Sequence, residues 1–365
     1  MAGRFVSRPR LEGRRAAGGT KAEALIAKAE ALAEAPLPPG APRLAALVEA
    51  ASAALAGEAA TLRPRDSSGR PGGLLELPPL PTVLVPDLHA RPRFIASVLG
   101  WKPPGRRETL ASLLEAGGAC LVCLGDLFHT EAGGARKRWN AAYLEYASAW
   151  SSRAWMDEEM GLCLAAASIV LEAKAAFPSV FHYLKGNHDN ISDEEGRGDH
   201  SFYKFAAEGE MVASWFRLNY GERLLGSYRA FELDLPLLAL GPHFAASHGE
   251  PAFPLGRDDI IEYRSRPDVV ESLIWTANGE AEEFSVERSL QALLGPKRSK
   301  GALWFAGHRP VSTRYALRAG GRFVQFHDPE AYRVVYLSSS RYPNPDRDIL
   351  DIPLLHRNKF LEPCE

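Results

Sequence analysis

The amino-acid sequence predicts an α/β fold in which helices cover β-sheets. From Thr82 onward, short apolar runs end abruptly in polar residues: TVLVPDLHA, ACLVCLGDLFH, VFHYLKGNHD, FAASHGE and LWFAGHRP. Each run is typical of a buried strand whose last residues enter a loop. Helix-forming segments separate the early runs, above all residues 137–176, which favours sheets with helices packed outside them. Near the C-terminus, GGRFVQFHDPEAYRVVYLS predicts a hairpin around HDPEA, which adds antiparallel strands.

The N-terminal part, residues 1–76, is expected to be an Ala-rich helical extension that ends in a linker. Thr20 can cap a helix through KAEALIAKAEALAEA, and a second helix can run from about Pro42 to Gly57, with PLPPGAP breaking the chain between them. RPRDSSGRPGG at 63–73 predicts the linker.

Length and composition are those of an ordinary globular protein. The 365 residues exceed the usual size of one domain, and the 46% hydrophobic content lets most of the chain bury a core. The 43 Lys and Arg residues balance 45 Asp and Glu residues, so a nucleic-acid partner is not expected, although a local basic patch stays open. Four scattered cysteines favour a reducing compartment, and we expect the cytoplasm. No apolar stretch reaches the roughly 18 residues of a membrane span, so no membrane partner is expected. The sequence does not indicate an oligomeric state.

Residue types that bind metals recur where the predicted strands end. Carboxylate, imidazole and amide carbonyl groups suit a pair of divalent ions, and one shared carboxylate would bridge them. Strand ends at one edge of a sheet gather residues that are distant in sequence, so these loops can converge. Two neighbouring metals would polarise a phosphoryl oxygen and supply a hydroxide for attack. The residues are Asp87, His89, Asp126, Asn187, His188, His248 and His308.

The ordered motifs D-x-H, G-D-x-x, G-N-H-D, H-G and G-H resemble the calcineurin-like metallophosphoesterases over about residues 82–340. The resemblance implies an α/β fold of two mixed β-sheets packed as a sandwich flanked by helices, and a centre of two manganese, iron or zinc ions. In that centre Asp87 and His89 would hold the first metal and Asp126 would bridge. His188 would donate a proton to the leaving alkoxide. The second metal would take Asn187, His248 and His308. We therefore expect the catalytic domain over residues 77–345 and a C-terminal tail over 346–365.

Further segments resemble the phosphoprotein phosphatase branch of that superfamily. They are ELDLPLLALGPHFAASHGEP, SLIWT and GHRPVSTRYALRAGGRFVQF. Pro310 stands where the nuclease-like branches carry a second histidine, so the first metal would have three protein ligands, as in the phosphatases. Two positions depart from the branch: His129 and Thr130 replace an Asp that orients the catalytic histidine and an Arg that binds phosphate. GDLFH instead resembles the double-strand-break repair nucleases of the superfamily, in which a histidine at this place assists the reaction.

Four residues have roles that the sequence leaves open. His188 needs a partner, which is either a carboxylate, Asp189 or Glu131, or the imidazole of His129 acting as a pair. His129 is otherwise a loop cap. Phosphate needs a cation beside the metals, and Arg91 and Arg309 are the candidates, unless they are simply solvated.

The expected activity is hydrolysis of a phosphate monoester by metal-bound hydroxide, on a phosphoprotein or a small phosphorylated molecule. Phosphodiesterase or nuclease activity at the same site is the alternative, and an inactive binding scaffold is the second alternative. In the helical span, Trp139, Tyr143, Tyr146 and Trp150 recur at helical spacing, which places them on one helical face. We expect this face to pack on the sheet, and a substrate-recognition surface is the alternative.

Overall fold

Two mixed β-sheets form the centre of the protein in the computed structural model, which describes residues 19–354. The five-stranded sheet has the order β11-β10-β2-β3-β4, and in it β2, β3 and β4 run parallel. The six-stranded sheet has the order β1-β5-β6-β7-β9-β8, and in it β6, β7 and β9 run parallel. The strands of the first sheet are Ile349–Asp351, Arg333–Leu337, Thr82–Val85, Cys120–Cys123 and Phe181–Tyr183. Those of the second are Leu74–Glu76, Leu238–Leu240, Phe244–Ser247, Leu303–Ala306, Phe323–Gln325 and Ala316–Arg318.

Apolar side chains from both sheets meet in one buried cluster. Leu84 and Val122 of the first sheet belong to it together with Ala246, Phe305 and Val324 of the second. The sheets therefore pack face to face, and the predicted fold class, two mixed sheets flanked by helices, is confirmed.

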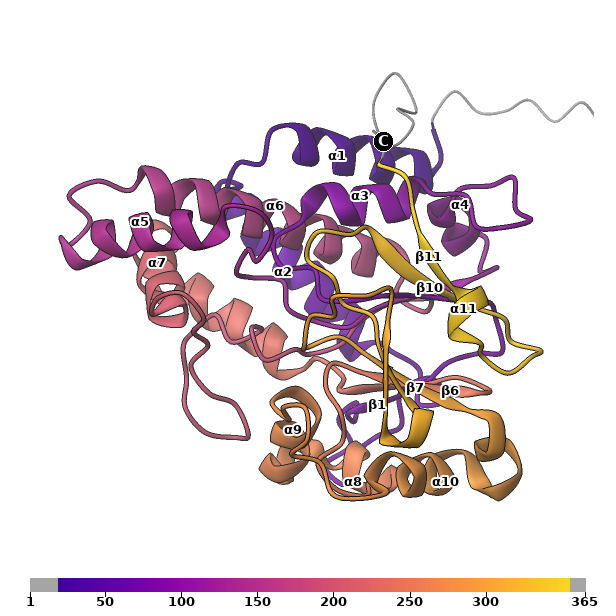
Figure 1. Cartoon of the computed structure of the whole chain (residues 1–365). Helices are drawn as coiled ribbons and strands as arrows, with labels where there is room; N and C mark the ends of the chain where they lie inside the picture. Colours follow the sequence, from indigo (N-terminus) through magenta and orange to yellow (C-terminus); the bar gives the residue numbers. More distant parts are fainter. Residues whose placement is uncertain (1–18, 355–365) are drawn as a thin grey trace, which may run out of the picture.

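Helices cover the outer faces of this sandwich. Figure 1 shows α1, α3, α4 and α6 on one side of the strands and α8, α9 and α10 on the other. None of the helices within residues 19–354 combines the length and apolar character needed to cross a bilayer. On the side of the five-stranded sheet lie α1 (Lys21–Glu34), α2 (Ala41–Ala56), α3 (Pro92–Gly100), α4 (Leu110–Glu115), α5 (Ala135–Ala147), α6 (Ala154–Ala176) and α7 (Glu208–Leu233). The other side has α8 (Arg257–Ile261), α9 (Pro267–Ile274) and α10 (Ser285–Arg298), and the one-turn α11 (Pro345–Asp348) precedes β11.

The two N-terminal helices form as the sequence predicts. The Thr20 side chain accepts a hydrogen bond from Glu23 N, and Glu23 returns one to Thr20 N, which is a capping box. Buried alanines and leucines of both helices belong to the same core as the helices over the first sheet. Strand β1, from the end of the predicted extension, pairs with β5, and β11, from the predicted tail, pairs with β10. The division at residues 76 and 345 stays a prediction, and residues 1–18 and 355–365 lie outside the described part of the chain.

The hairpin predicted around HDPEA is wrong. Strand β9 before it pairs with β7 and β8 in the six-stranded sheet, whereas β10 after it pairs with β2 and β11 in the other. The segment therefore crosses from one sheet to the other. Alternating apolar residues reveal a strand but not its partner, so the pattern alone could not exclude this crossing.

The aromatic face predicted for the helical span is only partly confirmed: Tyr146 and Trp150 are partly buried against the core that contains Trp139, but Trp150 lies outside the helix and Tyr143 is exposed. Helix α5 ends at Ala147, and Trp150 lies in a left-handed conformation with φ 62° after it. Trp139 is fully buried, whereas Tyr143 keeps 43% of its surface exposed. Only Trp139 of the two belongs to the core.

Candidate metal centre

The loops that follow parallel strands of both sheets carry the predicted ligands to one place. Asp87 and His89 follow β2, Asp126 follows β3, and Asn187 follows β4. His248 follows β6 and His308 follows β7 in the facing sheet. Because parallel strands present their carboxyl ends at the same edge, both sheets deliver polar side chains to a common site. All six are brought together, and all but the partly buried His308 are buried.

His89 directs a lone pair into a group of carboxylates. Its Nδ1 lies 2.9 Å from the carbonyl oxygen of His129, which can only accept, so Nδ1 carries the proton. Burial lowers the pKa of His89 to about 3, which leaves the ring neutral and Nε2 unprotonated. That Nε2 lies 3.4 Å from Asp126 Oδ2, 3.8 Å from Asp87 Oδ2 and 3.5 Å from Glu131 Oε1. A lone pair among carboxylate oxygens is an arrangement that a cation stabilises.

His248 directs a second lone pair toward other acceptors. Its Nδ1 lies 2.9 Å from the carbonyl oxygen of Leu124, so this nitrogen is again the donor. Burial lowers the pKa of His248, and Nε2 faces Asn187 Oδ1 at 2.8 Å and His308 Nδ1 at 3.1 Å. The same Nε2 lies 3.5 Å from Asp126 Oδ2. This second group therefore shares the Asp126 carboxylate with the first.

The carboxylate of Asp87 lacks any donor within the described residues. The side chain is fully buried, and neither of its oxygens has a hydrogen-bond partner. Burial, together with the charges of Asp87 and Asp189, raises the pKa of Asp126 well above its usual range. Buried carboxylates without donors are costly unless a cation is nearby, so the set of donor atoms fits divalent metal ions.

Strained backbone and glycines hold these ligands close together. His89, Asp126, His129 and His308 adopt positive φ angles of 40°, 56°, 74° and 59°. Such conformations cost energy outside glycine and tend to occur at functional sites. At Gly307 a Cβ atom would collide with the carboxylate of Asp87, so glycine lets that strand end approach the site.

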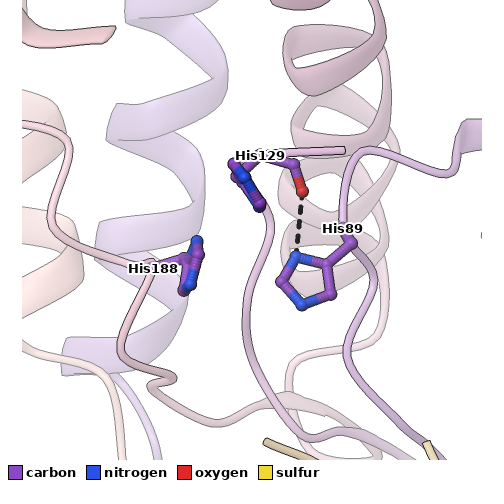
Figure 2. A group of neighbouring side chains, drawn as sticks. All are labelled: His89, His129 and His188. Atoms are coloured by element: carbon purple, nitrogen blue, oxygen red, sulfur yellow. Dashed lines mark hydrogen bonds between the residues drawn. The ribbon is translucent and has the colours of Figure 1, made fainter. Parts of the chain in front are cut away.

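His188 lies beside His129 rather than beside a carboxylate. The two ring centroids are 4.9 Å apart, and His89 is the third ring of the group (Figure 2). Phe202 stacks on His188, with ring centroids 4.7 Å apart. The Nδ1 atom of His188 has no hydrogen-bond partner among the described residues. Burial, with the neighbouring His129 and His89, lowers the pKa of His188 well below its usual value.

The two carboxylates considered for His188 are occupied elsewhere. Asp189 accepts hydrogen bonds from the backbone N–H groups of Asp126, Leu127 and Gly186. Glu131 pairs with the ammonium group of Lys204. The remaining alternative is the pair with His129, whose Nε2 lies 3.4 Å from Glu208 Oε1. The ring of His129 is fully buried and stacks on Trp139.

The two arginines differ in their surroundings. The buried guanidinium of Arg91 donates to the backbone carbonyls of Asp87, Leu88, Asp328, Pro329 and Ala331. This network anchors the segment that crosses between the sheets, so its donors are not directed at a substrate, and we do not propose Arg91 as a phosphate ligand. Arg309 is exposed beside His308 and stays a candidate.

His327 and Glu208 lie near the site without any motif that identifies them, and the sequence indicated Glu131 only as a possible partner of His188. His327 was hidden because its segment was interpreted as a hairpin turn, although it follows an apolar strand just as the other histidines do. Lys204 belongs to the long connection between β4 and α7, and Glu208 is the first residue of α7; no motif marks either residue.

Comparisons with known proteins agree with the fold. The chain is similar to the solved structure of a protein serine/threonine phosphatase from Saccharomyces cerevisiae with similarity to human phosphatase PP5, with a TM-score of 0.51, 13% identity, and coverage of 86% of this chain and 90% of that chain. Two structures of cold-active protein tyrosine phosphatase, the second from a psychrophilic Shewanella species, give TM-scores of 0.43 and 0.42 at 13% identity, covering 76% and 77% of this chain and 80% and 82% of theirs. No protein-family model and no curated protein matches the sequence.

The fold and the site together are those of a phosphatase-like α/β protein with possible metal ligands at its strand ends. The chain has the two-sheet architecture seen in a solved phosphatase, with clusters of histidine and aspartate that could bind metals at the strand ends. At 13% identity, the likeness shows the fold alone.

Proposed function

We propose that this protein is a metal-dependent phosphoesterase with two metal positions that share Asp126. The observation that carries the proposal is the place of Asp126 Oδ2, 3.4 Å from His89 Nε2 and 3.5 Å from His248 Nε2. Both nitrogens bear lone pairs, because the other nitrogen of each ring donates to a carbonyl oxygen. Asp87 would complete the first position, and Asn187 and His308 the second. Bound divalent ions of manganese, iron or zinc would supply Lewis acidity toward a phosphoryl oxygen and toward water.

The protein's own residues would bind the phosphate and supply the proton. Arg309 is an exposed cation next to His308 in the chain and is suited to phosphate oxygens. His188 would protonate the leaving oxygen. Because its pKa is lowered, the protonated ring becomes populated only as the pH falls, so activity should be highest on the acidic side of neutrality.

His129 is proposed to assist His188. The ring of His129 lies next to that of His188, with centroids 4.9 Å apart, and its Nε2 lies 3.4 Å from the carboxylate of Glu208. Glu208 would therefore act on His188 through His129, in place of an aspartate bound directly to His188. His129→Ala keeps the backbone carbonyl that orients His89, so metal content should be unchanged while turnover falls about a hundredfold. Near-normal turnover would reduce His129 to a loop residue.

A phosphate monoester is the preferred substrate, either a phosphoprotein or a small phosphorylated molecule. The preference is supported by the segments that resemble the phosphoprotein phosphatase branch and by the similar fold of a serine/threonine phosphatase. The alternative, a phosphodiesterase or nuclease, is supported by the presence of His129 beside His188. The cytoplasm stays our prediction for its location.

One paired experiment tests these proposals. Metal content and the hydrolysis of a generic phosphomonoester and a generic phosphodiester are measured for the wild type, Asp126→Asn and the control His243→Ala, which lies outside the site. We expect up to two metal equivalents and monoester hydrolysis in the wild type and control, and neither in Asp126→Asn. Unchanged metal content in Asp126→Asn would refute the shared carboxylate. Faster diester hydrolysis would favour the alternative, and bound metal without hydrolysis would indicate a scaffold.

A further inference from the structure

We propose that His327 is an additional protein ligand of the first metal position, an inference that rests on the proposed function. The residue lies two positions beyond β9, in the segment that crosses from one sheet to the other. Its ring is fully buried, and its centroid lies 5.3 Å from that of His89. The first position would then take a histidine from each sheet.

The donor atoms around this position lie close enough together to share one ion. His327 Nε2 lies 3.9 Å from Asp87 Oδ2, and His89 Nε2 lies 3.8 Å from that same oxygen. Asp87, His89 and His327 each offer a ligand atom within 4.8 Å of the others. In an octahedral site, ligands at about 2.1 Å from a common ion are about 3.0 Å apart when adjacent and about 4.2 Å apart when opposite. Both distances to Asp87 Oδ2 lie between these limits.

The competing explanation is a hydrogen bond from His327 to Glu131. Nε2 of His327 lies 3.3 Å from Glu131 Oε2, so such a bond is possible without a metal. It leaves two observations unexplained, however. Asp87 would still lack a donor in full burial, and the lone pair of His89 would still face Asp87, Asp126 and Glu131. Glu131 already has a cationic partner in Lys204, so it does not require a second one. One cation between these groups would neutralise the Asp87 carboxylate and accept lone pairs from His89 Nε2 and His327 Nε2. It would leave His327 Nδ1, which has no hydrogen-bond partner among the described residues, as it is.

The backbone also keeps His327 in place. Its carbonyl oxygen accepts a hydrogen bond of 2.9 Å from Val311 N, in the loop that carries His308. Arg91 binds the carbonyls of the next two residues, Asp328 and Pro329. The backbone that carries the imidazole is therefore anchored by residues close to the metal ligands, as an ordered ligand requires.

The test measures metal affinity, not activity. Metal-free wild type, His327→Phe, Glu131→Gln and the control His243→Ala are titrated with Mn²⁺ in a calorimeter, and the melting temperature of each metal-free protein verifies folding. Loss of a residue that hydrogen-bonds to a metal ligand lowers metal affinity by about 10–100-fold, so loss of a direct ligand should lower the affinity by more than about a hundredfold. We expect His327→Phe to lose one of two binding events to that extent while the other event and the control are unchanged.

Several outcomes would overturn the proposal. Two unchanged binding events in His327→Phe would exclude ligation, and an equal loss of less than about a hundredfold in His327→Phe and Glu131→Gln would show that His327 acts through Glu131. If the Phe variant does not fold, His327→Gln loaded with Co²⁺ is compared with the Co²⁺-loaded wild type by visible absorption spectroscopy. Identical spectra would contradict ligation by His327, and a changed spectrum would support it. A wild type that binds no metal would instead refute the proposed function.

Discussion

Asp189 joins the loop after β3 to the loop after β4, and Asp189→Asn should loosen both. Its Oδ2 accepts hydrogen bonds from Asp126 N at 3.1 Å and from Gly186 N at 2.8 Å, while Oδ1 accepts one from Leu127 N at 3.2 Å. The hydroxyl of Tyr183 lies 2.9 and 3.0 Å from the two oxygens. Since the side chain is 1% exposed, water cannot replace these contacts.

The expected loss of stability follows from these bonds. The asparagine carbonyl can replace only one carboxylate oxygen, so at least one backbone N–H would face the amide NH₂ group. An unsatisfied buried donor costs about 1–3 kcal/mol, and the two or three retained bonds each lose roughly 1 kcal/mol of charge assistance. The free energy of unfolding should therefore fall by about 4 kcal/mol.

Urea unfolding of the metal-free protein, followed by tryptophan fluorescence, measures this loss. Tyr183→Phe is the matched control, because it removes one hydroxyl and leaves the three backbone bonds, and it should cost only about 1–1.5 kcal/mol. A loss below about 1 kcal/mol in Asp189→Asn, at an unchanged denaturant slope, would refute the view that this carboxylate holds the loops together.

Three further predictions concern the core. Burial alone would raise the pKa of Glu58, but His182, Lys174 and Arg63 outweigh it and lower this pKa from 4.5 to about 2. The ionised Glu58 therefore stabilises the fold fully above pH 4.5, and this stabilisation is lost as the pH falls toward 2. The unfolding free energies of the wild type and of Glu58→Gln should converge by about 3 kcal/mol over that range. Trp139→Ala should cost about 3–5 kcal/mol, because the ring is fully buried, while Tyr143→Ala should cost less than about 1 kcal/mol in the same denaturation assay. Burial raises the pKa of Cys120 to about 12 and raises that of Cys123 as well, so a disulfide reagent at pH 8 should label these thiols only after unfolding; rapid labelling of the folded protein would contradict their burial.

The local pattern of the sequence determined the strands of the site and the identity of most of its ligands. Apolar runs of strand length ending at Asp87, Asp126, Asn187, His248 and His308 identified five strand ends, because burial of a strand is visible in consecutive apolar residues. Parallel pairing then brings such ends to one edge, so the convergence of distant residues followed from a general property of α/β sheets. The two N-terminal helices were equally accessible, since caps and proline breaks act locally.

Only the tertiary structure decided which strands are neighbours and what each polar side chain contacts. The period of two is the same for every strand, so it could not show that β9 and β10 belong to different sheets and that the crossing brings His327 to the site. Arg91 and Asp189 are bound by backbone groups that are distant in sequence or in neighbouring loops, and no side-chain pattern encodes such partners. Residue types and local secondary structure follow from the sequence pattern, whereas the hydrogen-bond partner of each group depends on sheet register and on the packing of one sheet against the other.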